Sequence, residues 1–401
     1  MKSPTNVSDF LTTIFKVVQR QGFEDVVLDL RNIKSVFPNA CVPIVSIINY
    51  YRNELKVDVS CEKTPLFLGK VNFDQPLLAS KQSLKDNFDS TNRVWKFSDT
   101  YGVSALTNFY VQFLKERLEC NQGVLEAFEW CLNEMMDNVL QHSKVSEGFI
   151  MAQVHAESHK VAICLSDTGV GIFNTLRQSV YKPRNAVDAI TFSVKEGVTR
   201  DSKEHQGNGL WGLLEIVKEN AGRLTITSGK GSLFYNEGRA KTYSNLPFLN
   251  DKYQGTTVDF QINTDSPLSV SKALGGHTPI NLRMELSEND SGEHIILVRD
   301  NSHGTGTRKA AVQLRNIIIN TINEGASKII IDFQEIGVIS SSFADELIGK
   351  LVVRFGFFNF QSLITLKNMT ETVQYILHRS VAQRMAESLQ SNNNLIDENS
   401  E

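Results

Sequence analysis

The chain has 401 residues, of which 41% are hydrophobic, so two or three packed domains are expected rather than one. The formal net charge of −4 gives no basic footprint for nucleic acid, and no apolar run is long enough to span a bilayer. The five cysteines are scattered and no signal peptide is visible. We therefore expect reduced core cysteines in a cytoplasmic protein that binds neither membrane nor nucleic acid.

The N-terminal part alternates helical and strand patterns. Residues 7–21 have a helical period, and residues 25–30 form an apolar run typical of a buried strand. Residues 39–55 predict a second helix and residues 56–61 a second strand. This alternation predicts a small α/β domain over residues 1–85, with a docking or regulatory role.

An amphipathic helix predicted over residues 123–142 carries Glu134, Asn138 and His142 along one polar face, because they are spaced four apart. An Asn amide oxygen is a good neutral ligand for Mg²⁺. A carboxylate one helical turn earlier can orient or deprotonate a nucleophile. The alternative is a solvated polar face, which such spacing often produces on surface helices.

A buried strand at residues 160–165 runs directly into Asp167, Gly169 and Gly171. A carboxylate at the end of a strand can accept a hydrogen bond from an exocyclic amine, such as the 6-amino group of adenine. Glycines beside it let the backbone approach a flat ring and tolerate positive φ. For an isolated copy of this pattern, an ordinary turn at a strand end is the alternative.

A second glycine motif, with Gly207, Gly209 and Gly212, opens an apolar helix. Backbone N–H groups at such a helix N-terminus form an anion site suited to phosphates, whereas the alternative is that the glycines permit close helix packing. The charged segment before it, residues 173–206, lacks one clear period, as functional lids often do. Its cations, which could meet phosphates or remain solvated, include Lys195, Arg200 and Lys203.

These elements predict an α/β sandwich in which one mixed sheet is covered on one face by helices at 123–142 and 209–220. Residues 67–100 are expected to be a connector with weak periodicity. The strands of the sheet are expected at 148–154, 161–165, 223–228 and 256–262.

The motifs, in this order, resemble those of the GHKL superfamily of gyrase-, histidine-kinase- and mismatch-repair-type ATPases. The match covers residues 100–263, where it implies a Bergerat-type α/β sandwich, and four motifs in order on the right elements are specific. The N-box is matched by Glu134-x-x-x-Asn138-x-x-x-His142 and the G1 box by Asp167-x-Gly169-x-Gly171. The G2 box is matched by Gly207-x-Gly209-Leu210-x-Gly212 and the last short box by Gly255-Thr256-Thr257.

Within the superfamily the sequence is most similar to anti-sigma-factor serine kinases. The resemblance implies ATP and Mg²⁺ as cofactors, with Asn138 as metal ligand and Glu134 as catalytic base. It places Asp167 at adenine, and it implies ATP-binding roles around the base and phosphates for Gly169, Gly171, Gly207, Asn208, Gly209, Leu210, Gly212 and Thr256. The sequence departs from the family where Trp211 moves Gly212 one position later than in the commonest G2 form. No phosphoacceptor histidine precedes the domain, which argues against a two-component histidine kinase.

Residues 275–386 resemble a STAS-like domain, a relative of anti-sigma-factor antagonists, and imply protein partners or self-association. The matching residues are Asp332, Phe333 and the run 339–346. Strands are predicted at 295–300, 328–333 and 360–366, and helices at 307–324, from about 343, and at 369–384. Residues 387–401 are polar and acidic and are expected to be disordered. The run 25–41 resembles a degenerate copy of the same layout.

In antagonists of this kind the phosphorylated serine lies after a strand, at the start of a helix, and Ser341 is the candidate phosphoacceptor here. The helix dipole would favour a phosphate at that position. The preferred interpretation is helix capping, because Ser342-x-x-Asp345 fits a capping box and because Asp345 and Glu346 would repel an added phosphate.

Three functions remain open from the sequence. The first is a Mg-ATP-binding regulator that hydrolyses ATP or changes shape with it and signals through the STAS-like domain. The second is a serine/threonine protein kinase of the anti-sigma type, and the third is a non-catalytic nucleotide sensor that acts by binding partners. Glu134 favours the first two, in which it would align either water or a serine hydroxyl.

Overall fold

The computed structural model describes residues 3–143, 147–198, 209–276, 288–289 and 291–397. The chain divides into two compact units, one of residues 1–113 with 126–279 and the other of residues 114–125 with 280–401. In these described ranges no helix combines the length and the apolar composition needed to cross a bilayer.

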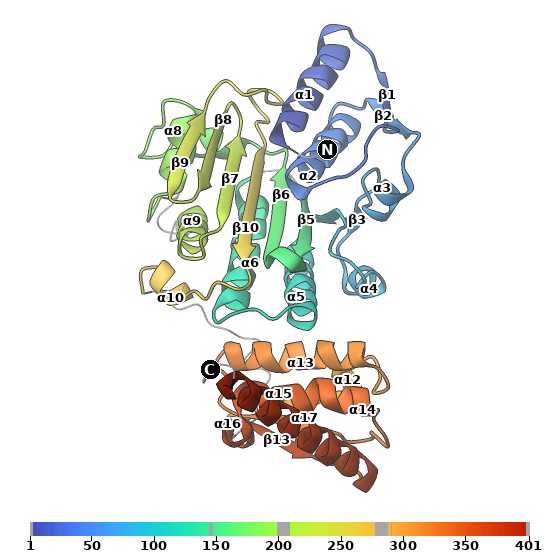
Figure 1. Ribbon diagram of the computed structural model, residues 1–401. Coiled ribbons are helices and arrows are strands. Elements are labelled where there is room, and N and C mark those ends of the chain that lie inside the picture. Colours follow the sequence, from blue (N-terminus) through green and yellow to red (C-terminus); the bar gives the residue numbers. More distant parts are fainter. Residues whose placement is uncertain (1–2, 144–146, 199–208, 277–287, 290, 398–401) are drawn as a thin grey trace. The chain divides into compact units, whose positions relative to one another are not determined.

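The first unit is built on an eight-stranded mixed sheet with the order β3-β4-β5-β6-β10-β7-β8-β9 (Figure 1). Neighbouring strands are antiparallel except for β3 and β4, which are parallel. The four strands predicted from the sequence are confirmed as β5, β6, β7 and β10 at its centre. The strands are β3 (Leu77–Leu78), β4 (Trp95–Phe97), β5 (Gly148–His155), β6 (Lys160–Asp167), β7 (Arg223–Ser228), β8 (Gly231–Asn236), β9 (Arg239–Tyr243) and β10 (Thr256–Asn263).

One face of the sheet is covered by three helices. Trp95 and Ile150 are cross-strand partners and so point to the same face, where the Trp95 ring packs on Phe109 with centroids 5.9 Å apart. The Thr107 hydroxyl donates a hydrogen bond of 2.7 Å to the Asn133 side chain, which joins the first two helices. The helices are α5 (Thr100–Arg117), α6 (Val124–His142) and α9 (Gly209–Glu219).

The opposite face of β5 and β6 packs against α2 (Pro38–Asn53). Different residues line this face, because successive strand residues point to opposite faces of the sheet. Phe149, Met151 and Cys164 of the sheet share one buried cluster with Val45 and other residues of α2. The prediction that helices cover only one face is therefore wrong for these strands. The helix is buried almost all round for the same reason.

The N-terminal residues belong to the same compact unit as the sheet, which differs from the separate domain predicted over residues 1–85. The physical reason is that α2 contributes to the core of the sheet rather than to one of its own. The run predicted as a buried strand forms β1 of a two-stranded sheet, and its alternate residues Asp25, Val27 and Asp29 share one exposed face. The elements are α1 (Pro4–Phe15), a π-helical turn (Lys16–Arg20), β1 (Asp25–Asp29) and, parallel to it, β2 (Asp58–Glu62).

Short helices occur in the segments whose sequence has no clear hydrophobic periodicity. The connector at 67–100 contributes two of them and the strands β3 and β4, and the segment at 173–206 contributes part of α7 and the whole of α8. The helices are α3 (Leu66–Lys70), α4 (Lys81–Asp86), α7 (Gly171–Leu176), α8 (Ala186–Ser193) and α10 (Val270–Ala273).

The second unit contains a parallel three-stranded sheet in the order β11-β12-β13. Its central strand is a run of buried isoleucines, as an internal parallel strand requires. The third predicted strand begins later than expected, because residue 360 lies in helix α16 and the strand starts at Ile364. The strands are β11 (His294–Leu297), β12 (Ile329–Asp332) and β13 (Ile364–Lys367).

Helices pack against this parallel sheet and share one buried cluster with it. The predicted helix at 307–324 is found as α13, whereas α17 continues to Asp397, through residues for which disorder was expected. The helices are α12 (Val298–Asn301), α13 (Arg308–Asn323), α14 (Ser341–Ala344), a π-helical turn (Asp345–Gly349), α15 (Lys350–Phe355), α16 (Phe357–Leu363) and α17 (Glu371–Asp397).

The segment 114–125, which joins α5 to α6, is held in the second unit by polar side chains of α13. The Asn320 side chain donates to the backbone oxygens of Lys115 and Leu118, at 3.0 and 2.7 Å, and accepts from the N–H of Cys120 at 2.7 Å. Asn316 and Asn323 each donate to a further backbone oxygen of the segment. A buried ion pair of 2.8 Å between Lys115 and Glu324 adds a charged contact.

Candidate functional site

The polar face of α6 meets the first residue of α9. A Cβ built on Gly209 would lie 2.9 Å from Glu134 Oε2 and 3.0 Å from Asn138 Nδ2. An added Cβ would therefore press on the ends of both side chains, so the backbone at the start of α9 lies close to them. Residues from two separate sequence motifs are thereby brought together.

Asp167 is the last residue of β6 and is buried, with 6% of its surface exposed. Its Oδ1 accepts a hydrogen bond of 2.7 Å from the N–H of Gly169, which is the single side-chain hydrogen bond that it makes among the described residues. Burial raises the pKa of this carboxyl to about 7, and the bond from Gly169 opposes the rise. The carboxyl group therefore retains acceptor capacity in a place that water hardly reaches.

The turn after Asp167 packs against the end of α6. The N–H of Val170 donates to the backbone oxygen of Ser143 at 2.9 Å, and a Cβ on Gly169 would overlap that same oxygen. Gly169 is thus required for the close approach, and it fixes the turn beside the helix that carries Glu134 and Asn138.

The last glycine motif closes onto the same turn. The N–H of Gly255 donates to the oxygen of Gly169 at 2.9 Å, and Thr256 is the register partner of Asp167. Gly171 has a φ of +78°, which only glycine adopts at little cost. These residues converge at one end of the central strands, where β6 ends and β10 begins.

Ser228, at the same end of the neighbouring strand β7, stabilises this region and was not singled out from the sequence. Its hydroxyl accepts from the N–H of Ile172 at 2.9 Å and donates to the oxygen of Gly255 at 2.9 Å. It therefore links two motifs that lie far apart in the sequence. Its place as the last residue of a predicted strand was the one signal available.

The second glycine motif divides into residues with different surroundings. A Cβ on Gly212 would lie 2.7 Å from Leu274 Cδ2 and would overlap the indole of Trp130, so its small size serves close helix packing. Leu210 is half-buried in the first turn of α9. Lys195 lies near Phe192, with its Nζ 5.0 Å from the centroid of the ring. Four further residues singled out in this region lie outside the described residues: Gly207, Asn208, Arg200 and Lys203.

Glu134 lies in an environment that disfavours its charged form. Burial raises the pKa of Glu134, and the neighbouring charge of Asp137 raises it further. Burial also raises the pKa of Asp137, which the sequence analysis did not single out. Groups with raised pKa values accept protons more readily near neutral pH, which suits Glu134 to act as a base.

Ser341 belongs to the second compact unit, where it is the exposed first residue of α14. The predicted capping arrangement is wrong in its residues, because the Ser340 hydroxyl accepts the N–H of Phe343 at 3.0 Å and so caps the helix. Ser342 instead interacts with Ser340, with 3.0 Å between their hydroxyl oxygens. The cap therefore uses Ser340 and leaves the Ser341 side chain at the surface.

The two acidic residues after Ser341 are paired with basic side chains. Asp345 accepts hydrogen bonds of 2.8 and 2.6 Å from Arg384. Glu346 accepts from Arg308 at 2.7 Å, and Arg315 also binds it. Arg384 lowers the pKa of Asp345. Burial raises the pKa of Glu346, but Lys350 and the two arginines outweigh it and lower that pKa overall, so both charges are compensated rather than available to repel a nearby phosphate.

Comparison with known proteins supports part of this organisation. Residues 310–374 match the family described as "STAS-like domain of unknown function (DUF4325)", which confirms a STAS-like domain in the C-terminal part. The chain is 25% identical over 213 residues to "Autoinducer 2 sensor kinase/phosphatase LuxQ" of Vibrio vulnificus (strain YJ016). This match covers 47% of the chain but only 22% of that relative's length. A crystal structure of full-length ShkA in complex with AMPPNP is 11% identical, with 96% of this chain and 72% of that chain covered and a TM-score of 0.23.

Proposed function

We propose that residues 100–263 form a Mg-ATP-binding domain of the GHKL type, and that the protein is a signalling regulator that hydrolyses ATP. The observation that carries the proposal is the close approach of Gly209 to Glu134 and Asn138, where an added Cβ would lie 2.9 and 3.0 Å from their side chains. It joins the motif proposed to bind phosphate to the motif proposed to bind metal and activate the nucleophile. The weak similarity to a sensor kinase/phosphatase supports a signalling context.

The residues present suit the proposed ligands. Asp167 offers a buried carboxyl group with unused acceptor capacity, which suits the amino group of adenine. Asn138 would hold Mg²⁺ through its amide oxygen, and the bound ion would offset the charge of the phosphates. Glu134 lies one helical turn from Asn138 and would orient water and accept its proton.

Signalling through the STAS-like domain is supported by the course of the chain. The segment 114–125 is part of the same compact unit as the STAS-like domain, where Asn320 binds its backbone. The same segment continues directly into α6, the helix that carries Glu134 and Asn138. A change in position or dynamics of α6 on nucleotide binding would thus have a direct covalent route to that unit.

The decisive experiment follows the γ-phosphate. Incubation of the full chain with Mg²⁺ and ATP labelled at the γ position is expected to release labelled inorganic phosphate. Label on protein would instead favour a protein kinase, and binding without release of label would favour a nucleotide sensor.

Asn138→Ala is expected to remove the metal-dependent part of ATP binding. We expect wild-type protein to bind ATP at least about tenfold more tightly with Mg²⁺ than with EDTA, and the variant to show nearly the same affinity in both. Calorimetric titration under both conditions measures the difference. Asn133→Ala on the same helix is the matched control, and a full Mg²⁺ dependence in Asn138→Ala would contradict the assignment.

Asp167→Asn is expected to weaken discrimination for adenine over guanine, because an amide can present a donor where the base needs an acceptor. Wild-type protein should bind ATP more tightly than GTP, with the preference reduced about tenfold or more in the variant. Titration of both nucleotides into both proteins tests this. An unchanged ratio of affinities would remove Asp167 from the base-binding role.

A second candidate function is a serine kinase that phosphorylates its own STAS-like domain. The observation that favours it is the exposed Ser341 beside acidic residues already paired with arginines. Under our proposal, mass spectrometry after incubation with Mg-ATP should find no stoichiometric phosphate on Ser341. Stoichiometric phosphate that disappears in Ser341→Ala would establish the kinase instead.

A further inference from the structure

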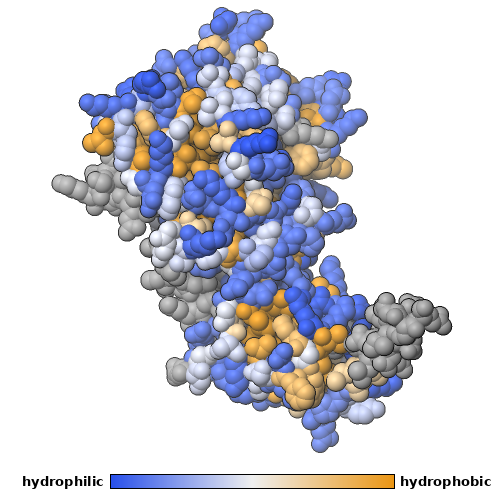
Figure 2. Space-filling view, turned by 60° about the vertical axis from the view of Figure 1, so that its left-hand side comes forward, coloured by the Kyte–Doolittle hydropathy of each residue, from blue (hydrophilic) through white to orange (hydrophobic). Residues whose placement is uncertain are grey.

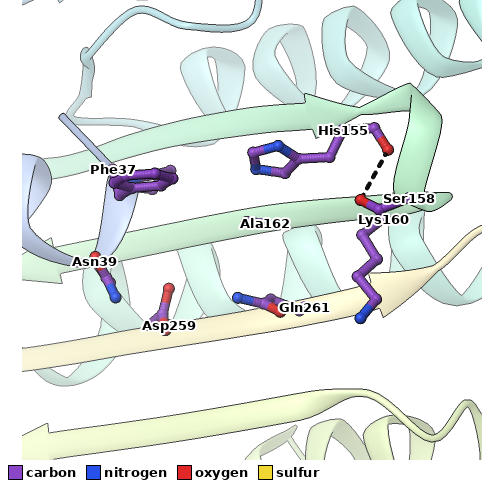
Figure 3. Close-up of a pocket in the computed structure, with 9 residues that line it drawn as sticks. Phe37, Asn39, His155, Ser158, Lys160, Ala162, Asp259 and Gln261 are labelled. Atoms are coloured by element: carbon purple, nitrogen blue, oxygen red, sulfur yellow. Dashed lines mark hydrogen bonds between the residues drawn. The ribbon is translucent and has the colours of Figure 1, made fainter. Parts of the chain in front are cut away.

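The first unit contains a pocket of about 250 Å³ on the sheet face opposite α6. It lies between the start of α2 and strands β6 and β10, and Phe37, Asn39, Asp259 and Lys160 are among its lining residues (Figure 3). Asp167 points to the other face of β6, because the odd-numbered and even-numbered residues of this strand alternate. The pocket is therefore separate from the proposed ATP site.

One end of the pocket presents two acceptor groups that have no donor as a partner. Asp259 is 8% exposed and makes no side-chain hydrogen bond or ion pair with any residue that the structure describes. The Oδ1 atom of Asn39 is buried and has no hydrogen-bond partner within the same described ranges. Burial raises the pKa of Asp259 to about 7, and the charge of Arg223 opposes this rise. A buried acid in this state costs free energy that a donating or cationic ligand would recover.

The other end of the pocket is basic. Lys160 starts β6 and is exposed, and it lies beyond Gln261 from Asp259 in Figure 3. Asp259 is the register partner of Cys164, four residues along β6 from Lys160, which separates the two charges by roughly 13 Å of strand. The pocket volume of about 250 Å³ suits a small molecule.

At the acidic end, Phe37 supplies a flat apolar wall. Its ring lies beside the Asn39 and Asp259 end and is partly exposed, as Figure 3 shows. Gln261 lies between the charged ends and offers both a donor and an acceptor. An aromatic or aliphatic body would therefore find apolar contact at Phe37, beside the end where its ammonium group would bind.

We propose that this pocket binds a small zwitterionic molecule, with its ammonium group at Asp259 and Asn39, its carboxylate at Lys160 and its apolar body against Phe37. An amine without a carboxylate would bind only the acidic end. A carboxylate without an amine would bind only Lys160 and would leave Asp259 without a cationic partner. The protein would then have a ligand-sensing site in the same unit as its ATP-binding candidate.

Three probes of matched shape test the proposal: 4-(aminomethyl)benzoate, benzylamine and 4-methylbenzoate. Calorimetric titration of the full chain at pH 8 is expected to show the zwitterion binding at least tenfold more tightly than either single-charge probe. Saturating Mg-ATP should not displace it, because the sites lie on opposite faces of the sheet. Equal affinity for all three probes, or displacement by ATP, would overturn the proposal.

Variants separate the two ends of the pocket. Asp259→Asn keeps the shape of the side chain and should weaken the zwitterion and benzylamine at least tenfold. Lys160→Gln should lower the affinity for the zwitterion to that for benzylamine, whereas the exposed Lys241→Gln on β9 is the control and should change neither. If circular dichroism shows that Asp259→Asn does not fold, Phe37→Ala takes its place and should also weaken binding of the zwitterion. Retention of zwitterion affinity in Lys160→Gln and Phe37→Ala would contradict the assignment.

Discussion

Glu134→Gln is expected to lower the rate of phosphate release about 10²–10⁴-fold while ATP affinity stays within about twofold. The glutamine keeps the shape of the side chain beside Gly209 but cannot accept a proton from water. Single-turnover release of labelled phosphate, together with calorimetric titration of ATP, measures both quantities. Wild-type turnover in this variant would leave Glu134 as a half-buried residue of α6 without a catalytic role.

The pH dependence of the wild-type rate follows from the same side chain. A base must be ionised, so turnover should fall as the pH drops through the pKa of Glu134, which burial and Asp137 hold above its ordinary value. Asp137→Asn is the matched control, since it removes one cause of that shift and keeps Glu134. We expect this variant to retain turnover and to move the acidic limb of the rate profile to lower pH.

Gly209→Ala is expected to lower Mg-ATP affinity by tenfold or more and turnover by about 10²-fold, because small displacements of catalytic groups have effects of this size. The added methyl group would press on Glu134 Oε2 and Asn138 Nδ2. Both atoms end side chains that can move aside, so the fold should persist while the two groups leave their positions. Titration and phosphate release measure the loss.

Gly69→Ala provides the comparison for that substitution. Gly69 also lies in a helix, but a Cβ there would meet nothing within 4 Å. Both alanines should favour their helices by about 0.5–1 kcal/mol, so a difference in activity between the variants cannot come from helix propensity. Equal Mg-ATP affinity in the two variants would mean that Gly209 is not part of the nucleotide site.

The candidate site was predictable from the sequence where its signals are local. Glu134 and Asn138 share a face because a helix repeats every 3.6 residues, and Asp167 follows a strand that its own apolar run indicates. The sequence could not distinguish the roles of Gly209 and Gly212, because only the tertiary structure shows that one meets polar side chains and the other meets Trp130. Ser228 was missed because its hydrogen bonds join segments distant in sequence.

The position of α2 was the main element of the fold that the sequence analysis missed. Its pattern gave the helix correctly, yet alternation with strands led to the interpretation of a separate domain. The apolar residues of α2 lie on all sides of the helix rather than in one stripe, and such a helix is expected to be buried on several sides. That signal was available, but the identity of the surface that buries it depends on long-range packing with β5 and β6.

The asparagines of α13 determine which fragments of this protein contain a complete second unit. A fragment of residues 280–401 would lack the segment 114–125, so Asn320 would lose its partners at Lys115, Leu118 and Cys120, and Glu324 would lose Lys115. These side chains would then face water, so the fragment would lose about 0.5–1.5 kcal/mol for each hydrogen bond, together with the packing of the segment. The unit can be isolated intact only if the loop between α5 and α6 is grafted back or supplied as a peptide. The conventional division of a chain at a single linker would break both halves.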